Sequence, residues 1–261
     1  MEPPVTSSAP PTSGYSPTWP RAPRSLAMGR GVEWWSEGWR VFTAAPLIWI
    51  GVIVVLAIAM LVLQIVPLIG QLAQLVLWPV FLGGLVLGCL ALARGQRLEF
   101  MHLFAGFRDG PVGALVILGL IAVAFGFALA LVVGVFAFGA VGMTGLEVLM
   151  RGDAAAMQRA IAGAGVGALI ALPIVILGSL LFMMAWWFAT PLVSLNRAQP
   201  MDALKASFDA SWKNIGALIV FVLIYLVLAI VATIPFGLGW LVLGPVAIGA
   251  NFASWREVFG D

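Results

Sequence analysis

Charged residues are scarce in this chain. Only 9% of its 261 residues are Asp, Glu, Lys or Arg, whereas 62% are hydrophobic, and the mean hydropathy is +1.10. Soluble domains carry about 25% charged and about 45–50% apolar residues, so this chain could not cover its apolar surface in water. The composition therefore predicts a membrane protein. The net charge of +2 is too small to indicate a nucleic-acid partner.

Cysteine and histidine are almost absent as well. Cys89 is the one cysteine, which excludes an intrachain disulfide and a cysteine-based metal cluster. It lies in an apolar run, where a free thiol usually acts as a small buried side chain. His102 has no second His, Cys or carboxylate at ligand spacing, so we expect a polar-face residue. The sequence predicts no metal site and no cofactor.

Catalytic chemistry is also missing. The long apolar runs hold no Asp, Glu, Lys, Arg or His in their interior, although such groups mark proton relays and ion-coupled carriers. No P-loop, HExxH or GxSxG motif is present. Ser179, Ser194 and Cys89 have no base beside them in the sequence that could activate a nucleophile. We therefore expect a protein that is not an enzyme, with no catalytic residues.

Long apolar runs are what the sequence has instead. About 20 helical residues, rising about 1.5 Å each, cross the hydrocarbon layer of about 30 Å. The runs predict an all-α integral membrane bundle of six transmembrane helices, at 47–66, 72–93, 112–139, 166–190, 215–234 and 240–254. In the third, Ala122, Gly126, Ala130 and Gly134 recur every fourth residue, a pattern that favours close helix packing. The polar segment 143–163 is expected to form a short surface helix.

Three amphipathic segments, at 31–43, 98–109 and 201–214, each precede a pair of spans. Apolar residues recur in them at steps of three and four, and the first carries Val32, Trp35, Trp39 and Phe42 on one predicted face. Each segment closes on an aromatic–basic pair: Trp39-Arg40, Phe107-Arg108 and Trp212-Lys213. These features predict interfacial helices that lie along the membrane plane.

The same plan predicts three amphipathic-helix-plus-hairpin units. Pro46 is expected to open the first span and Pro200 the third amphipathic segment, because proline suits the first position of a helix. The first and third units share a reversal, Pro67 to Gly70 and Pro235 to Gly239. They also share a proline in the returning helix, in Pro79-Val80 and Pro245-Val246.

The distribution of positive charge predicts the orientation. Eleven Lys and Arg residues fall on one side of the six spans, and only Arg151 and Arg159 fall on the other. The positive-inside rule then places both termini and all three amphipathic segments in the cytoplasm, so the units are parallel. Residues 1–29, rich in Pro and Ser, are expected to form a disordered cytoplasmic tail before the membrane domain of 30–261.

A few polar residues remain in or near the predicted spans, among them Gln64, Gln71, Gln74 and Asn251. They could line a cavity for a polar or amphipathic ligand. Hydrogen bonding between helices is the alternative, and we favour it, although each such bond contributes only about 1 kcal/mol or less.

Several motifs together resemble a known family. They are GxxWxxEGWRxF, PLIWI and VPLIG, then LGCxALxRG and HLFAGFR, then WWFATPLV, DALKASFDASWKN and IPFGLG. Over about residues 29–259 the chain resembles uncharacterised proteobacterial multi-pass inner-membrane proteins. It is distantly similar to the membrane portion of some glycerophosphodiester phosphodiesterases. The resemblance implies a bacterial inner membrane and six spans, and it transfers no functional residues.

Two functions follow as hypotheses. The first is a structural or envelope-organising protein without enzymatic activity, whose partners are the lipid bilayer and either another protein or a second copy of the chain. The alternative is a carrier or binding protein for a lipid or a small uncharged amphipathic molecule. Broken, glycine-rich spans around the glutamines favour it, because discontinuous helices build the binding sites of many carriers.

Overall fold

The structure, a computed structural model, describes residues 22–151 and 154–260. These residues form ten α-helices and one short 3-10 helix, without a strand among them. Five stretches are long and apolar enough to cross a membrane: Pro46–Leu63, Ile69–Ala93, Val112–Gly139, Met157–Asn196 and Ile215–Thr233. The prediction of an all-α membrane protein is confirmed. The predicted sixth span, 240–254, is not among the five.

The first unit contains helices α1 (Arg30–Ala44), α2 (Pro46–Leu63) and α3 (Ile69–Ala93). Pro46 is the first residue of α2, as predicted, where its missing N–H costs nothing. α2 ends three residues before the predicted bound at 66, and α3 begins three residues before the predicted 72. The reversal causes both shifts, because Leu68, directly after Pro67, has φ 63°, which no helix accepts.

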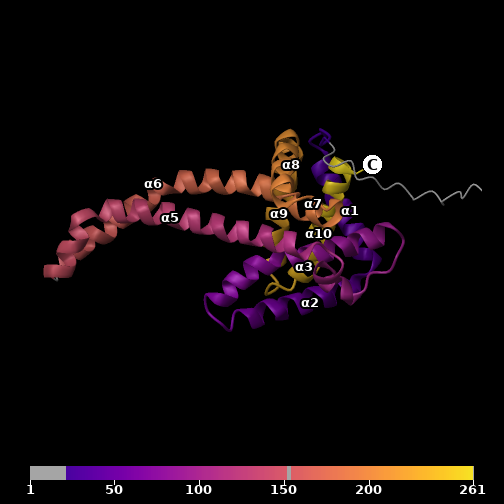
Figure 1. The fold of residues 1–261 in the computed structure, drawn as a ribbon, viewed down its shortest axis with the longest axis horizontal. Coiled ribbons are helices and arrows are strands. Elements are labelled where there is room, and N and C mark those ends of the chain that lie inside the picture. The colour runs from indigo at the N-terminus through magenta and orange to yellow at the C-terminus, as the bar shows by residue number, and fades with distance from the viewer. Residues whose placement is uncertain (1–21, 152–153, 261) are drawn as a thin grey trace, which may run out of the picture.

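Helices α5 (Val112–Arg151) and α6 (Ala154–Trp186) form a long hairpin that extends well away from the rest of the molecule (Figure 1). α5 bends at Gly142, whose φ of 53° suits glycine. The prediction of one separate surface helix over 143–163 is wrong, because residues 143–151 form a helix beyond the break at Gly142 and residues 154–163 belong to α6. Val148 and Ala160 are buried together there.

The small residues of α5 do not pack as predicted. A Cβ added at Gly126 or Gly134 would meet no atom within 4 Å, so these glycines face open space. The close approach of the two helices occurs instead at Gly167, where a Cβ would overlap the carbonyl of Phe136. The repeat of small residues therefore does not form the contact between α5 and α6.

The predicted span 166–190 is interrupted before Pro191. α6 ends at Trp186 and α7 (Ala189–Asn196) follows. The cause is Ser207, whose Oγ accepts the Phe188 N–H at 2.9 Å and donates to the Met184 carbonyl at 2.9 Å. The hydroxyl thus stands between two groups that a continuous helix would pair directly. Pro191 has no N–H for the Trp187 carbonyl, which instead accepts the Asn251 side-chain N–H at 3.0 Å.

The third unit is close to prediction. α8 (Pro200–Lys213) and α9 (Ile215–Thr233) match the expected bounds within one residue. α10 (Trp240–Phe259) continues five residues past the predicted 254. The reversal between α9 and α10 resembles the first one, because Phe236, directly after Pro235, also has a positive φ, of 53°.

The middle amphipathic segment differs from its prediction as one helix over 98–109. It consists of a 3-10 helix, η1 (Phe100–Phe104), and a single turn, α4 (Ala105–Arg108). Glu99 has an extended backbone and forms a capping box with His102, whose Nδ1 accepts the Glu99 N–H at 3.0 Å. His102 therefore has a local structural role, because it satisfies a backbone donor at the start of η1.

The predicted tail ends earlier than residue 29. The Leu26 N–H donates to Asn214 Oδ1 at 2.8 Å, and Asn214 Nδ2 donates to the Arg24 carbonyl at 2.9 Å. The Arg24 N–H also donates to the Val258 carbonyl at 3.1 Å. Residues 24–28 are therefore fixed beside α8 and α10, and the first 21 residues of the predicted tail lie outside the described part.

Candidate functional site

Each amphipathic segment presents the same three kinds of residue in the same way. A buried small residue is followed by an exposed aromatic residue and an exposed basic residue. We name these groups the triplets: Gly38-Trp39-Arg40, Gly106-Phe107-Arg108 and Ser211-Trp212-Lys213. They contain six of the seven aromatic and basic residues that the sequence singled out; the seventh is Trp35.

The small residue of every triplet lies against a backbone carbonyl of another helix. A Cβ on Gly38 would overlap the Val246 carbonyl, and one on Gly106 would overlap the Val80 carbonyl. Ser211 Oγ donates to the Met184 carbonyl at 2.9 Å. The sequence analysis did not identify these small residues as contact points. A small residue beside each aromatic–basic pair could have indicated them, because small residues let two helix backbones approach closely.

The aromatic residues of the triplets remain on the surface. Trp39 is 53% exposed, Phe107 37% and Trp212 63%. Phe107 packs edge-on against Phe81, with ring centroids 5.2 Å apart, so its ring is held in place. An exposed ring beside a cation is typical of the membrane–water interface, where one edge is apolar and the other wet.

Trp35 has a different role from the one predicted. Its ring stacks on Phe221 with centroids 4.6 Å apart, and its Nε1 donates to the Phe221 carbonyl at 3.3 Å. The buried face of α1 contains Trp34 and Trp35 between two glycines, whereas Val32 and Trp39 are exposed. The predicted apolar face is wrong at Val32 and Trp39, because α9 and α10 pack against the face of α1 that contains the two glycines.

The four candidate cavity residues are not together. Gln64 and Gln71 are exposed around the reversal before α3, and Gln74 is partly buried in its second turn. Asn251 precedes Phe252, which lines a pocket with Ala93 at the other end of α3. The glutamines and Asn251 therefore lie at opposite ends of this helix. Asn251 makes the hydrogen bond between helices described above.

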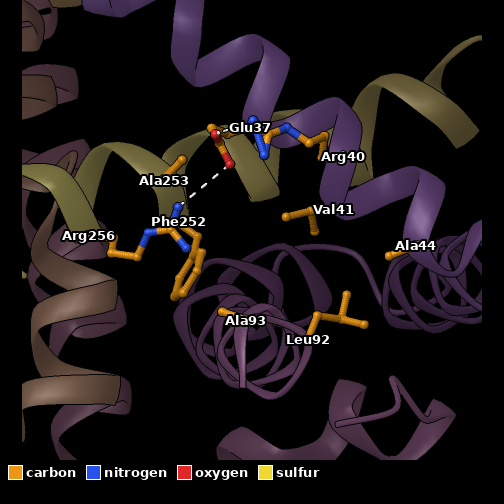
Figure 2. A pocket seen from close by; sticks show the side chains of 9 residues that line it. All are labelled: Glu37, Arg40, Val41, Ala44, Leu92, Ala93, Phe252, Ala253 and Arg256. Carbon is orange, nitrogen blue, oxygen red and sulfur yellow. Dashed lines mark ion pairs between the residues drawn. The ribbon is translucent and has the colours of Figure 1, made fainter. Parts of the chain in front are cut away.

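A charged groove runs between α1 and α10. It contains two pockets, of about 220 and about 260 Å³, that share Glu37, Ala253 and Arg256. Arg40 contacts Glu37 at 3.0 Å, and Arg256 lies 3.6 Å from the other Glu37 oxygen (Figure 2). Deeper in the groove, Arg30 pairs with Glu257 at 2.5 Å.

The groove was not predicted. Four arginines and three glutamates line its two pockets: Arg24, Arg30, Arg40, Arg256, Glu33, Glu37 and Glu257. The sequence gives no signal for this cluster, because Glu257 accepts the Trp34 Nε1–H at 2.7 Å across 223 residues of chain. Among the described residues, no group of three or more His, Cys, Asp and Glu could hold a metal ion.

Comparison with known proteins identifies one informative relative. The chain is 29% identical over 231 residues to a probable inner membrane protein of Burkholderia thailandensis, covering 85% of this chain and 79% of the relative. No protein-family model and no solved structure matches the chain. Together with the apolar helices, the relative identifies a multi-pass helical protein of the inner membrane. Its name says nothing of a phosphodiesterase, so that part of the resemblance stays a prediction.

Proposed function

We propose that this protein organises the bacterial envelope as a membrane scaffold without enzymatic activity. The observation that carries the proposal is the α5–α6 hairpin. α6 has 33 residues, about 50 Å at about 1.5 Å per residue, whereas the hydrocarbon layer is about 30 Å thick. The distal part of the hairpin therefore extends beyond the membrane as a rod that can reach another component of the envelope.

An even number of membrane crossings is part of this proposal. Arg24 and Gly260 are in direct contact, through a hydrogen bond of 2.7 Å, so the two ends of the described chain lie on the same side of the membrane. Five crossings would place them on opposite sides. This contact supports α10 as the sixth crossing, despite its Arg256 and Glu257 near the C-terminal end.

We also propose that the three units form a closed ring with their entrances in the cytoplasm. The contacts of the triplets support it, since each unit's triplet touches the returning helix of the preceding unit. Gly38 of the first unit meets α10 of the third, Gly106 of the second meets α3 of the first, and Ser211 of the third meets α6 of the second. The eleven Lys and Arg residues on the predicted cytoplasmic side support this orientation.

The scaffold role is tested by shortening the hairpin. Residues 140–165 are replaced by a short Gly-Ser linker, and the variant is expressed in a strain that lacks the protein. We expect wild-type abundance in the membrane but no recovery of envelope integrity, measured as resistance to detergent. The Gly126→Ala variant, altered where a Cβ meets no atom, is the matched control and should restore integrity. Full recovery with the shortened hairpin would refute the proposal.

Lipid binding is the second candidate function. The groove between α1 and α10 favours it over a cavity around the glutamines, because the groove joins a charged pocket to a partly apolar one. A lipid has the same two parts, a charged headgroup and an apolar chain.

A further inference from the structure

We infer that the groove between α1 and α10 binds the headgroup of an anionic glycerol phospholipid. The inference rests on the second candidate function and is independent of the scaffold role. It is carried by where the groove lies, how its polarity changes along its length, and which charges it presents.

The groove lies at the level of lipid headgroups. Its lining includes Ala44, two residues before Pro46 opens α2, and Leu92 and Ala93 in the last turn of α3. Both helices are candidate membrane spans. Their ends mark the boundary between hydrocarbon and water, which is where the phosphate of a phospholipid resides.

Polarity falls from one pocket to the next. The pocket of about 220 Å³ is lined mainly by charged side chains, whereas that of about 260 Å³ adds Val41, Leu92 and Phe252. Figure 2 shows Leu92 and Ala93 across the pocket from Glu37. A headgroup can therefore occupy the charged pocket while its glycerol and first methylene groups contact the apolar lining.

Arg40 and Arg256 are available for a phosphate. Their side chains are 74% and 49% exposed, and both share the single carboxylate of Glu37. The distance from Arg256 to Glu37, 3.6 Å, is too long for a hydrogen bond, so the guanidinium retains unused donors. Two arginines on one phosphodiester would form charge-assisted hydrogen bonds with planar, paired geometry.

The carboxylates decide which headgroup fits. Four arginines against three glutamates leave one net positive charge, which the single negative charge of a phosphodiester compensates. An ammonium group would compete with arginines for the carboxylates, because Glu33 pairs with Arg30 and Glu37 contacts Arg40 and Arg256. A choline group needs aromatic faces, but Trp34 is only 1% exposed. A glycerol phospholipid, whose headgroup carries the phosphate charge alone, is therefore preferred over ethanolamine and choline phospholipids.

The test uses the full-length protein, delipidated in mild detergent and titrated with ethanolamine, choline and glycerol phospholipids of identical acyl chains. Native mass spectrometry measures the bound fraction. We expect the glycerol lipid to bind at least about fivefold more tightly than the others. Arg256→Gln should weaken it about tenfold, which corresponds to the loss of one charge-assisted hydrogen bond. Arg40→Gln, at a more exposed site, should weaken it about threefold.

Arg108→Gln is the matched control, because Arg108 is an exposed triplet arginine that does not line the groove. It should leave binding unchanged. Equal losses in Arg108→Gln and Arg256→Gln would show attraction to basic surface in general and overturn the inference. Tighter binding of the ethanolamine or choline lipid would overturn it too. Every variant should elute as the wild type does in size-exclusion chromatography, which shows that it is folded. The lipid titration and the hairpin experiment test separate proposals, so the failure of one leaves the other intact.

Discussion

Arg24 donates a side-chain hydrogen bond to the Gly260 carbonyl at 2.7 Å, although 236 residues separate the two in the chain. The backbone N–H of Arg24 also donates to the Val258 carbonyl at 3.1 Å. The two ends of the described chain are thus held together, and they lie against α1 and α10, which also form the charged groove.

This contact leads to a prediction of topology. A reporter fused at Asp261 should be active in the cytoplasm, and one inserted after Asp153 should be active outside it. The reason is that the six proposed crossings would return the chain to its starting side, with the end of the α5–α6 hairpin on the opposite side. Paired alkaline phosphatase and fluorescent-protein fusions measure both. Opposite sides for a reporter at the N-terminus and one at Asp261 would contradict six crossings.

Gly38 should tolerate no side chain. Gly38→Ala is expected to lower the free energy of unfolding by about 1–3 kcal/mol, because its Cβ would overlap the Val246 carbonyl and force α1 from α10. Unfolding in a titration with sodium dodecyl sulfate measures the change. Gly126→Ala on α5 is the matched control, since its Cβ meets no atom within 4 Å, and it should not destabilise the protein. Equal stability of the two variants would refute the close approach.

Ser207 should be needed for the break between α6 and α7. Ser207→Ala removes the acceptor of the buried Phe188 N–H, so we expect a loss of about 1–3 kcal/mol in the free energy of unfolding. The same titration measures it. Ser211→Ala should cost less, because the Met184 carbonyl keeps its bond from Ser207. Exposed Ser36 provides a control without an expected effect.

Asn214 should hold the chain before α1 in place. Its side chain bonds to Leu26 and Arg24, so Asn214→Ala is expected to expose the Arg24 peptide bond to trypsin and to speed cleavage there severalfold. Mass spectrometry of timed digests gives the rate at that site. Asn251→Ala, which loses only its bond to Trp187, should leave the rate unchanged. Equal acceleration in both variants would indicate general loosening.

Local patterns in the sequence were sufficient for the membrane class and most helix bounds. The apolar runs fixed four spans closely, and Pro46 and Pro200 begin the helices they were expected to begin. The aromatic–basic pairs were also evident, since one lies within each amphipathic segment. These features depend on residues that are close together in the sequence, so the local sequence pattern is enough to predict them.

Tertiary structure decided the rest. α6 ends where Ser207, 19 residues after Phe188, accepts the Phe188 N–H and so interrupts the hydrogen bonds of the helix. The buried face of α1 depends on Gly38 meeting α10, and the groove depends on Glu257 reaching Arg30 and Trp34. An overlap with a distant carbonyl or an ion pair across 200 residues leaves no periodic pattern in the sequence. Composition and periodicity thus determined that this protein spans a membrane, and only packing determined where its charged groove lies.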